Sequence, residues 1–307
     1  MISQDNLLKD GKLHIFLLGS GGPINNEKRV TSSIALIANG EFVLFDVGPG
    51  TYRNADLMRL PVTQLSAIFL THFHSDHIGD LGEANMMSWA SGRSKPIEVY
   101  GPEGVEKVVD GFKMAYEFDT GYRIAHHGKE IVPPEAGIPI SKTIIIQNSS
   151  DRELCYNRNE VKIFAFQVDH TPVNPALGYR IEYKGLSVIL TGDTIKTENL
   201  VKHSNNADIL LSEAISFELL NNLVAAVKKI NPRTAKILTD IQSYHMNPIS
   251  AAKLAKEAKV KKLVFIHITP PLQTKNLENI YLKGVTDEFD GEVILGEDRM
   301  EISLEPN

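Results

Sequence analysis

The segment Ile68-Phe-Leu-Thr-His-Phe-His-Ser-Asp-His77 decides the fold class, because an apolar run leads directly into a cluster of metal-binding side chains. Apolar runs of four to six residues predict buried strands. Five further runs end in a residue that can bind a metal or move a proton, and the core would hold such a residue rigidly. These runs end at Asp46, His170, Asp193, Glu213 and His267. The pattern predicts a metal site at the edge of a sheet, and therefore a metal-dependent hydrolase.

Length and composition are those of a globular protein with ample core. The chain has 307 residues, of which 42% are hydrophobic and 23% charged, and we expect one domain over 1–307. The formal charge of −6 argues against a general nucleic-acid binder. A single cysteine, Cys155, excludes a disulfide within the chain and fits a reducing compartment. No run approaches the ~18 apolar residues of a membrane helix. The first residues also lack the features of a secretion signal, so we expect a cytoplasmic protein.

Each half of the chain is rich in strands, then helical, and each half contributes metal-binding residues. This loose duplication predicts an α/β fold, an αββα sandwich of two mixed sheets with helices on the outer faces. The expected strands are 12–19, 32–38, 42–46, 67–71, 161–168, 178–183, 186–190, 208–212, 262–266, 293–295 and 300–304. The expected helices are 79–90, 102–116, 197–204, 217–229 and 248–258. We expect 117–158 to be irregular, with loops and short strands that could form a flap over the site.

The cluster from His72 to His77 offers three imidazoles and a carboxylate within six residues. His72 and His74 alternate on an extended loop, so their rings can converge on one ion. Asp76 and His77 follow where a helix begins and can point to a second ion. Histidine nitrogen with some carboxylate oxygen favours Zn²⁺, with Mn²⁺ or iron as alternatives.

The motif HxHxDH resembles the metallo-β-lactamase superfamily, and the resemblance extends from Gly19 to about His267. It implies the metallo-β-lactamase fold and two divalent metal ions. The ligands that it implies for the first ion are His72, His74, His170 and Asp193. The ligands that it implies for the second ion are Asp76, His77, Asp193 and His267. The early aspartate of the family matches Asp46, which would support the histidines.

Two further residues resemble the ribonuclease Z-like branch of this superfamily, Glu213 and His245. In that branch a Glu–His pair serves the leaving group. An alkoxide or phenoxide leaving group needs a proton, and a histidine oriented by a carboxylate can deliver it. The resemblance implies catalytic roles for Asp76, Glu213 and His245.

The chain also departs from ribonuclease Z. Only 22 residues separate His170 from Asp193, so the long arm that grips tRNA is absent there. The segment after His267 reads Ile-Thr-Pro-Pro, where ribonuclease Z has a signature that meets phosphate. Three stretches, 122–128, 169–180 and 267–271, resemble metallo-β-lactamase-type arylsulfatases. In its motifs the chain is most similar to these arylsulfatases and to zinc phosphodiesterases.

These observations favour a binuclear hydrolase of a small or medium anionic ester, either a phosphodiester or an aryl sulfate. The first alternative is a ribonuclease Z-type tRNA 3′-processing endonuclease. This alternative needs a nucleic-acid partner, which the acidic net charge of the chain does not favour. The second alternative is a metal-stabilised binding module without catalysis. Dimers are frequent in the branch, so a homodimer stays open.

Three residues outside the ligand set also carry expectations. His126 and His127 are expected either as a surface loop pair or as a flap that lines the substrate pocket. Trp89 is expected to pack on the helix after the motif.

Overall fold

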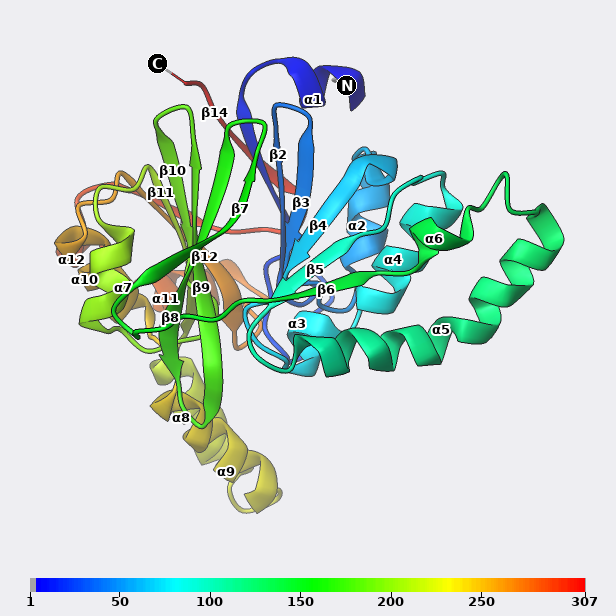
Figure 1. Cartoon of the computed structure of the whole chain (residues 1–307). Helices are drawn as coiled ribbons and strands as arrows, with labels where there is room; N and C mark the ends of the chain where they lie inside the picture. Colours follow the sequence, from blue (N-terminus) through cyan, green and yellow to red (C-terminus); the bar gives the residue numbers. More distant parts are fainter. Residues whose placement is uncertain (1–3, 307) are drawn as a thin grey trace.

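Two seven-stranded sheets lie face to face with helices on their outer sides in the computed structural model, which describes residues 4–306 (Figure 1). The first sheet has the strand order β14 (Met300–Leu304), β1 (Leu13–Gly19), β2 (Ser33–Ala38), β3 (Glu41–Phe45), β4 (Leu65–Phe69), β5 (Glu98–Gly101) and β6 (Ile140–Thr143). The second has the order β13 (Glu292–Leu295), β12 (Lys262–Thr269), β11 (Ile209–Ile215), β10 (Leu186–Leu190), β9 (Val173–Tyr183), β8 (Val161–His170) and β7 (Arg152–Arg158). The expected αββα sandwich is confirmed.

The helices follow the strands in two groups. Those of the first half are α1 (Gln4–Lys9), α2 (Thr51–Leu57), α3 (Ser75–Ile78), α4 (Leu81–Ala90), α5 (Val105–His127) and α6 (Pro134–Gly137), with the 3-10 turn η1 (Val62–Gln64). Those of the second half are α7 (Glu198–Ser204), α8 (Phe217–Val227), α9 (Pro232–Asp240), α10 (Pro248–Glu257), α11 (Lys275–Leu282) and α12 (Val285–Glu288), with the 3-10 turn η2 (Ile241–Ser243). No helix among residues 4–306 is long and apolar enough to cross a membrane.

The core has three layers. Between the sheets, buried side chains of both sheets pack together, among them Phe69 of β4 and Tyr179 of β9. A second layer lies between the first sheet and its helices, and a third between the second sheet and its helices. Burial of apolar surface stabilises by roughly 25 cal/mol per Å², so these layers hold the strand ends in place.

Parallel strands bring the candidate residues to one edge. Strands β3 to β6 run parallel in the first sheet, and β10 to β13 run parallel in the second. Parallel strands end at a common edge, which is where ligands bind in open α/β sheets. Asp46 and His72 follow β3 and β4, Asp193 follows β10, and Glu213 and His267 lie near the ends of β11 and β12.

The helices of 102–143 differ from the expectation. Helix α5 runs for 23 residues, through Gly111 and Gly121, into the segment that we expected to be irregular. Glycine is less favourable than alanine within a helix by up to about 1 kcal/mol. Gly111 and Gly121 therefore made the sequence look less helical than it is. The expected helix 79–90 is confirmed as α4, and the short helix α3 precedes it within the motif. Trp89 lies on α4, the helix after the motif, and packs with Val132 and Ala136, while its indole N–H donates to the Pro133 carbonyl oxygen at 2.8 Å.

Helix α9 was also missed, although its start carries a local signal. The Asn231 side chain caps the helix by accepting from the Thr234 N–H at 3.1 Å, and Pro232 occupies the first position. Asparagine at the cap followed by proline is a known helix start. Its two buried side chains, Ala235 and Leu238, pack it against its neighbours.

Candidate metal centre

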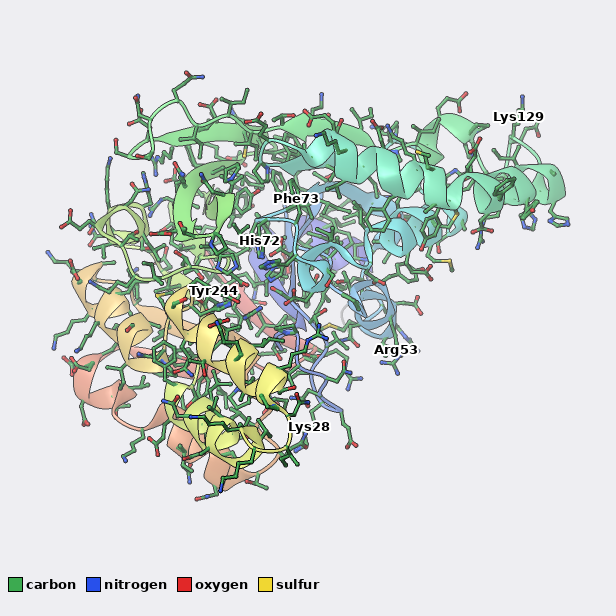
Figure 2. The ribbon with its side chains drawn as sticks, turned by 90° about the horizontal axis from the view of Figure 1, so that it is seen from below. Lys28, Arg53, His72, Phe73, Lys129 and Tyr244 are labelled. Carbon is green, nitrogen blue, oxygen red and sulfur yellow. The ribbon has the colours of Figure 1, made fainter. Side chains whose placement is uncertain are left out.

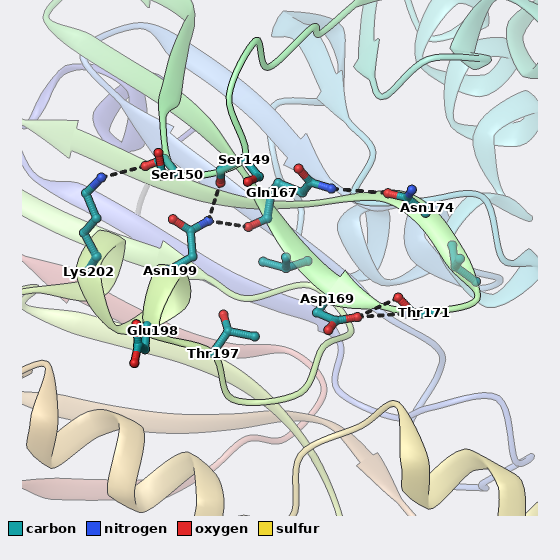
Figure 3. Close-up of a pocket in the computed structure, with 12 residues that line it drawn as sticks. Ser149, Ser150, Gln167, Asp169, Thr171, Asn174, Thr197, Glu198, Asn199 and Lys202 are labelled. Carbon is teal, nitrogen blue, oxygen red and sulfur yellow. Dashed lines mark hydrogen bonds between the residues drawn. The ribbon is translucent and has the colours of Figure 1, made fainter.

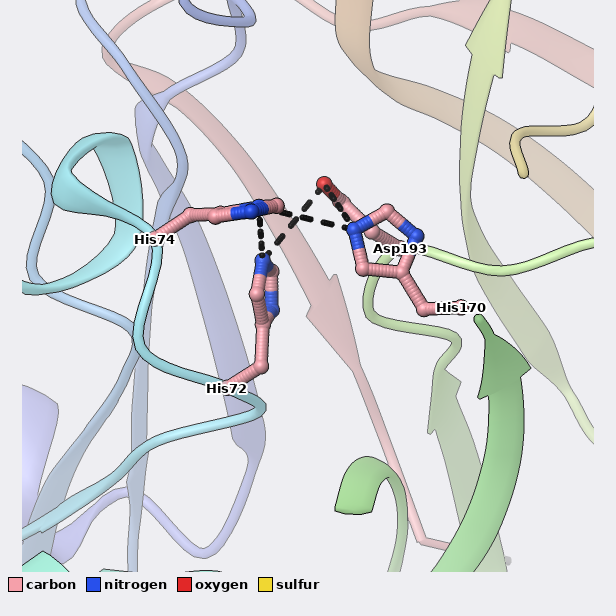
Figure 4. Close-up of side chains that lie close together, drawn as sticks. All are labelled: His72, His74, His170 and Asp193. Atoms are coloured by element: carbon pink, nitrogen blue, oxygen red, sulfur yellow. Dashed lines mark hydrogen bonds and ion pairs between the residues drawn. The ribbon is translucent and has the colours of Figure 1, made fainter. Parts of the chain in front are cut away.

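Three histidines and one aspartate form the first group of candidate ligands (Figure 4). The Nε2 atom of His72 lies 3.0 Å from Nδ1 of His74, which lies 3.5 Å from Nε2 of His170. The Oδ2 atom of Asp193 lies 3.8 Å from the first of these Nε2 atoms and 3.9 Å from the last. All four ligand atoms lie within 4.8 Å of one another, so a single cation could contact all of them.

The second group comprises Asp76, His77 and His267. The Asp76 Oδ2 atom lies 3.5 Å from Nε2 of His77 and 3.2 Å from Nε2 of His267. The Oδ2 atom of Asp193 lies 3.3 Å and 3.4 Å from the same two nitrogens. One carboxylate oxygen therefore reaches both groups, as a bridging ligand would.

Hydrogen bonds on the outer ring nitrogens orient three of the histidines. The Thr71 hydroxyl donates to Asp46 at 2.9 Å, so its oxygen accepts from Nδ1 of His72, also at 2.9 Å. Asp46 also accepts from Nδ1 of His77 at 2.8 Å, and the Tyr244 carbonyl accepts from Nδ1 of His170 at 3.0 Å. Each such bond leaves Nε2 with its lone pair directed into the centre.

Charge and burial act on these groups in opposite directions. Burial lowers the pKa of His72 well below its usual range and also lowers the pKa of His170, so both rings are neutral and able to ligate. Burial also opposes the charged form of His77, but Asp193 and Asp46 outweigh it and hold its pKa well above the usual range. Two carboxylates thus favour a positive charge beside Nε2 of His77, either a proton on this nitrogen or a metal ion in its place.

The fit to a cation has a direct structural test. The Nε2 atom of His77 is buried and has no hydrogen-bond partner within residues 4–306, although carboxylate oxygens lie nearby. Buried polar nitrogens are almost always satisfied. A divalent cation between this nitrogen and the carboxylates would satisfy all of them. The donor set of imidazoles and carboxylates suits zinc, manganese or iron, and it fits divalent metal binding.

The backbone is constrained around the centre. Asp46 and His267 adopt positive φ values of 54° and 50°, which are uncommon for residues other than glycine. Gly192, next to Asp193, has φ 60°, and a Cβ there would lie 2.7 Å from the Leu177 carbonyl oxygen. Such conformations persist only where the surrounding structure imposes them, and they gather at functional sites.

Glu213 and His245 lie together beside the second group. Nδ1 of His245 is 3.2 Å from Oε1 of Glu213. The same oxygen accepts from the backbone N–H of Met246 at 2.9 Å and of Thr194 at 3.2 Å, which fixes the carboxylate. The His245 ring stacks on His267 with centroids 5.4 Å apart. Burial lowers its pKa, but the charge of Glu213 prevails and raises the pKa to about 8.

The structure therefore brings together all nine of the residues predicted as ligands or catalytic groups, with Asp46 behind them. His74 is exposed and Asp76 half-buried, so these two mark the open side of the centre. Sequence reasoning missed Thr71 and the Tyr244 carbonyl. Threonine is common at strand ends, and every residue has a carbonyl, so no sequence signal could have identified either one.

The flap interpretation of His126 and His127 is wrong. Both residues lie exposed in the last turn of α5. Figure 2 shows Lys129, just beyond that helix, at the far end of the molecule from His72. The surface interpretation holds, although the pair lies on a helix and not on a loop.

A polar cavity of about 690 Å³ lies beside the centre (Figure 3). Asp169 and Thr171, which flank His170, line it, but none of the nine residues does. The Asn199 amide donates to the carbonyls of Ser149 at 2.9 Å and Gln167 at 2.8 Å. These bonds hold α7 against β8 and against the loop before β7. These three elements therefore form one wall of the cavity.

Comparison with known proteins identifies the family. A model described as "Beta-lactamase superfamily domain" matches residues 41–268. The chain is 33% identical over 297 residues to Ribonuclease Z of Mycolicibacterium gilvum, covering 96% of this chain and 97% of that protein. It is 32% identical to Ribonuclease Z of Mycobacterium bovis, with 96% and 99% covered.

Solved structures show the same fold. Human tRNase Z, short form, superposes with a TM-score of 0.67 at 23% identity, covering 94% of this chain and 98% of that one. The metallo-β-lactamase fold protein YhfI from Bacillus subtilis superposes with a TM-score of 0.65 at 18% identity, with 95% and 100% covered.

The names of the curated relatives favour the ribonuclease Z alternative over the small-ester interpretation. Family model, relatives and fold agree over nearly the whole chain. This chain belongs to the metallo-β-lactamase superfamily, as a metal-dependent hydrolase of ester bonds in the ribonuclease Z-like branch.

Proposed function

We propose that the protein cleaves phosphodiester bonds of RNA, with the 3′ end of precursor tRNA as its substrate. The observation that carries the proposal is the two-part centre with the Glu213–His245 pair beside it, in a chain whose full-length relatives are named Ribonuclease Z. A diester of RNA is anionic and has an alkoxide leaving group. The centre has the parts that such a substrate needs.

Two divalent ions would be held by the residues that gather here. His72, His74 and His170 would hold one ion, Asp76, His77 and His267 the other, and Asp193 both. When bound, such ions neutralise phosphate charge and lower the pKa of water. Zn²⁺ is the proposed metal because imidazole nitrogen dominates the donor set.

His245 is the proposed proton donor to the leaving oxygen. With a pKa of about 8 it is mostly protonated at neutral pH. Glu213 accepts from two backbone N–H groups, and its Oε1 atom forms an ion pair with Nδ1 of this ring at 3.2 Å, so it favours one orientation of the imidazole. The stacked His267 confines the ring further. Glu213 is therefore a positioning residue in this proposal.

A second candidate is a small anionic ester, either an aryl phosphodiester or an aryl sulfate. It is supported by the connection between His170 and Asp193, where β9 and β10 form a hairpin and no long arm projects. Without such an arm, the protein needs a different surface to bind a large RNA. The small-ester candidate does not.

A parallel rate assay distinguishes the two. The zinc-loaded protein is given precursor tRNA, bis(p-nitrophenyl) phosphate and p-nitrophenyl sulfate, with His245→Ala as the control. Cleavage at the tRNA 3′ junction that falls in the variant supports the proposal. Cleavage of p-nitrophenyl sulfate with intact tRNA would contradict it and favour the second candidate.

A further inference from the structure

Helices α8 and α9 form a hairpin that projects from the edge of the sandwich where the centre lies (Figure 1). The hairpin begins just after Glu213 and leads through η2 to Tyr244 and His245. Helix α8 has 11 residues, so its tip lies about 16 Å from its base. A small ester bound at the centre cannot reach that tip, whereas a polynucleotide can.

The hairpin is cationic in an acidic chain. From 217 to 240 it carries Lys228, Lys229, Arg233 and Lys236 against Glu218 and Asp240, a net charge of +2, although the chain has a formal charge of −6. Lys236 is paired with Asp240. The other three cations are exposed, and no ion pair is formed by any of them among the described residues. Unpaired cations on a projecting element mark a contact surface for a polyanion.

We propose that the tip of this hairpin, Lys228, Lys229 and Arg233, contacts the phosphate backbone of the RNA whose scissile bond lies at the centre. This inference rests on the proposed function and names the surface that holds the substrate. Contacts between cations and phosphates supply sequence-independent affinity through counterion release. The hairpin thereby serves in place of an arm between His170 and Asp193.

Charge neutralisation at the tip tests the inference. The variant carries Lys228→Gln, Lys229→Gln and Arg233→Gln. The matched control carries Lys95→Gln, Lys129→Gln and Lys256→Gln, which removes three exposed cations on other elements. Binding of precursor tRNA is measured by fluorescence anisotropy over a salt series, and cleavage of tRNA and bis(p-nitrophenyl) phosphate is measured in parallel.

The expected result is a Kd for tRNA raised about 10- to 100-fold and a salt slope reduced by about 2 to 3, since three phosphate contacts are lost. The diester rate stays unchanged. An unchanged Kd and salt slope, equal to the control, would overturn the inference. If the wild-type protein binds tRNA through the tip but does not cleave it, the proposed function fails and the surface stands. If the wild-type protein does not bind tRNA, both fail.

Discussion

Asp46 should control metal affinity without touching the metal. Its side chain is buried and accepts from the Thr71 N–H at 2.8 Å, the Thr71 hydroxyl at 2.9 Å and Nδ1 of His77 at 2.8 Å. Oδ2 of Asp46 accepts from both the Thr71 hydroxyl and Nδ1 of His77. In Asp46→Asn an NH₂ group takes the place of this oxygen, so donors meet donors and both hydrogen bonds are lost. Hydrogen bonds to charged groups contribute about 1.5–3 kcal/mol each, so we expect the free energy of unfolding to fall by about 3–5 kcal/mol.

The effect on the metal follows from orientation. His77 loses the acceptor on its outer nitrogen, and His72 loses the anchored hydroxyl. Loss of such partners typically lowers metal affinity about 10- to 100-fold. Competition with a chromophoric chelator measures the Kd for Zn²⁺, and urea unfolding measures the stability.

Asp208→Asn is the matched control for Asp46→Asn. Asp208 is a largely buried carboxylate that accepts from the Ser187 N–H at 2.7 Å, and it precedes β11, whose other end carries Glu213. This variant should lose stability and keep its zinc affinity. Equal zinc affinities in the two variants would refute the argument that Asp46 acts by orienting ligands.

Three further outcomes are expected. His245→Ala should lower kcat about 10²- to 10⁴-fold at unchanged zinc content. The protonated form of His245 donates the proton, and the pKa of this residue is raised to about 8. The rate of the wild-type enzyme should therefore fall above pH 8, and the His245→Ala variant should not show this decrease. Burial raises the pKa of Cys155 to about 12, so a thiol reagent should label the native protein slowly and the urea-unfolded protein fast. Gly192→Ala should lower the free energy of unfolding by about 1–3 kcal/mol because of its positive φ and the close Leu177 carbonyl, as thermal unfolding would show.

The agreement between sequence and structure is strongest where the chain signals itself locally. Buried strands are apolar throughout, and the parallel ones must end at a common edge. The pattern of residues therefore places Asp46 near His72 at the edge of the first sheet, and Asp193 near His267 at the edge of the second. The same reasoning failed for α5 and α9, because Gly111, Gly121 and the polar hairpin weaken the helical pattern.

By itself the sequence determined the layers of the sandwich and the identity of the candidate ligands, since both depend on patterns within short segments. Only the tertiary structure decided which carboxylate oxygen reaches both groups and which carbonyl orients His170. These features join residues that are far apart in the chain. Their positions depend on the packing of the two sheets, which no local pattern of residues specifies.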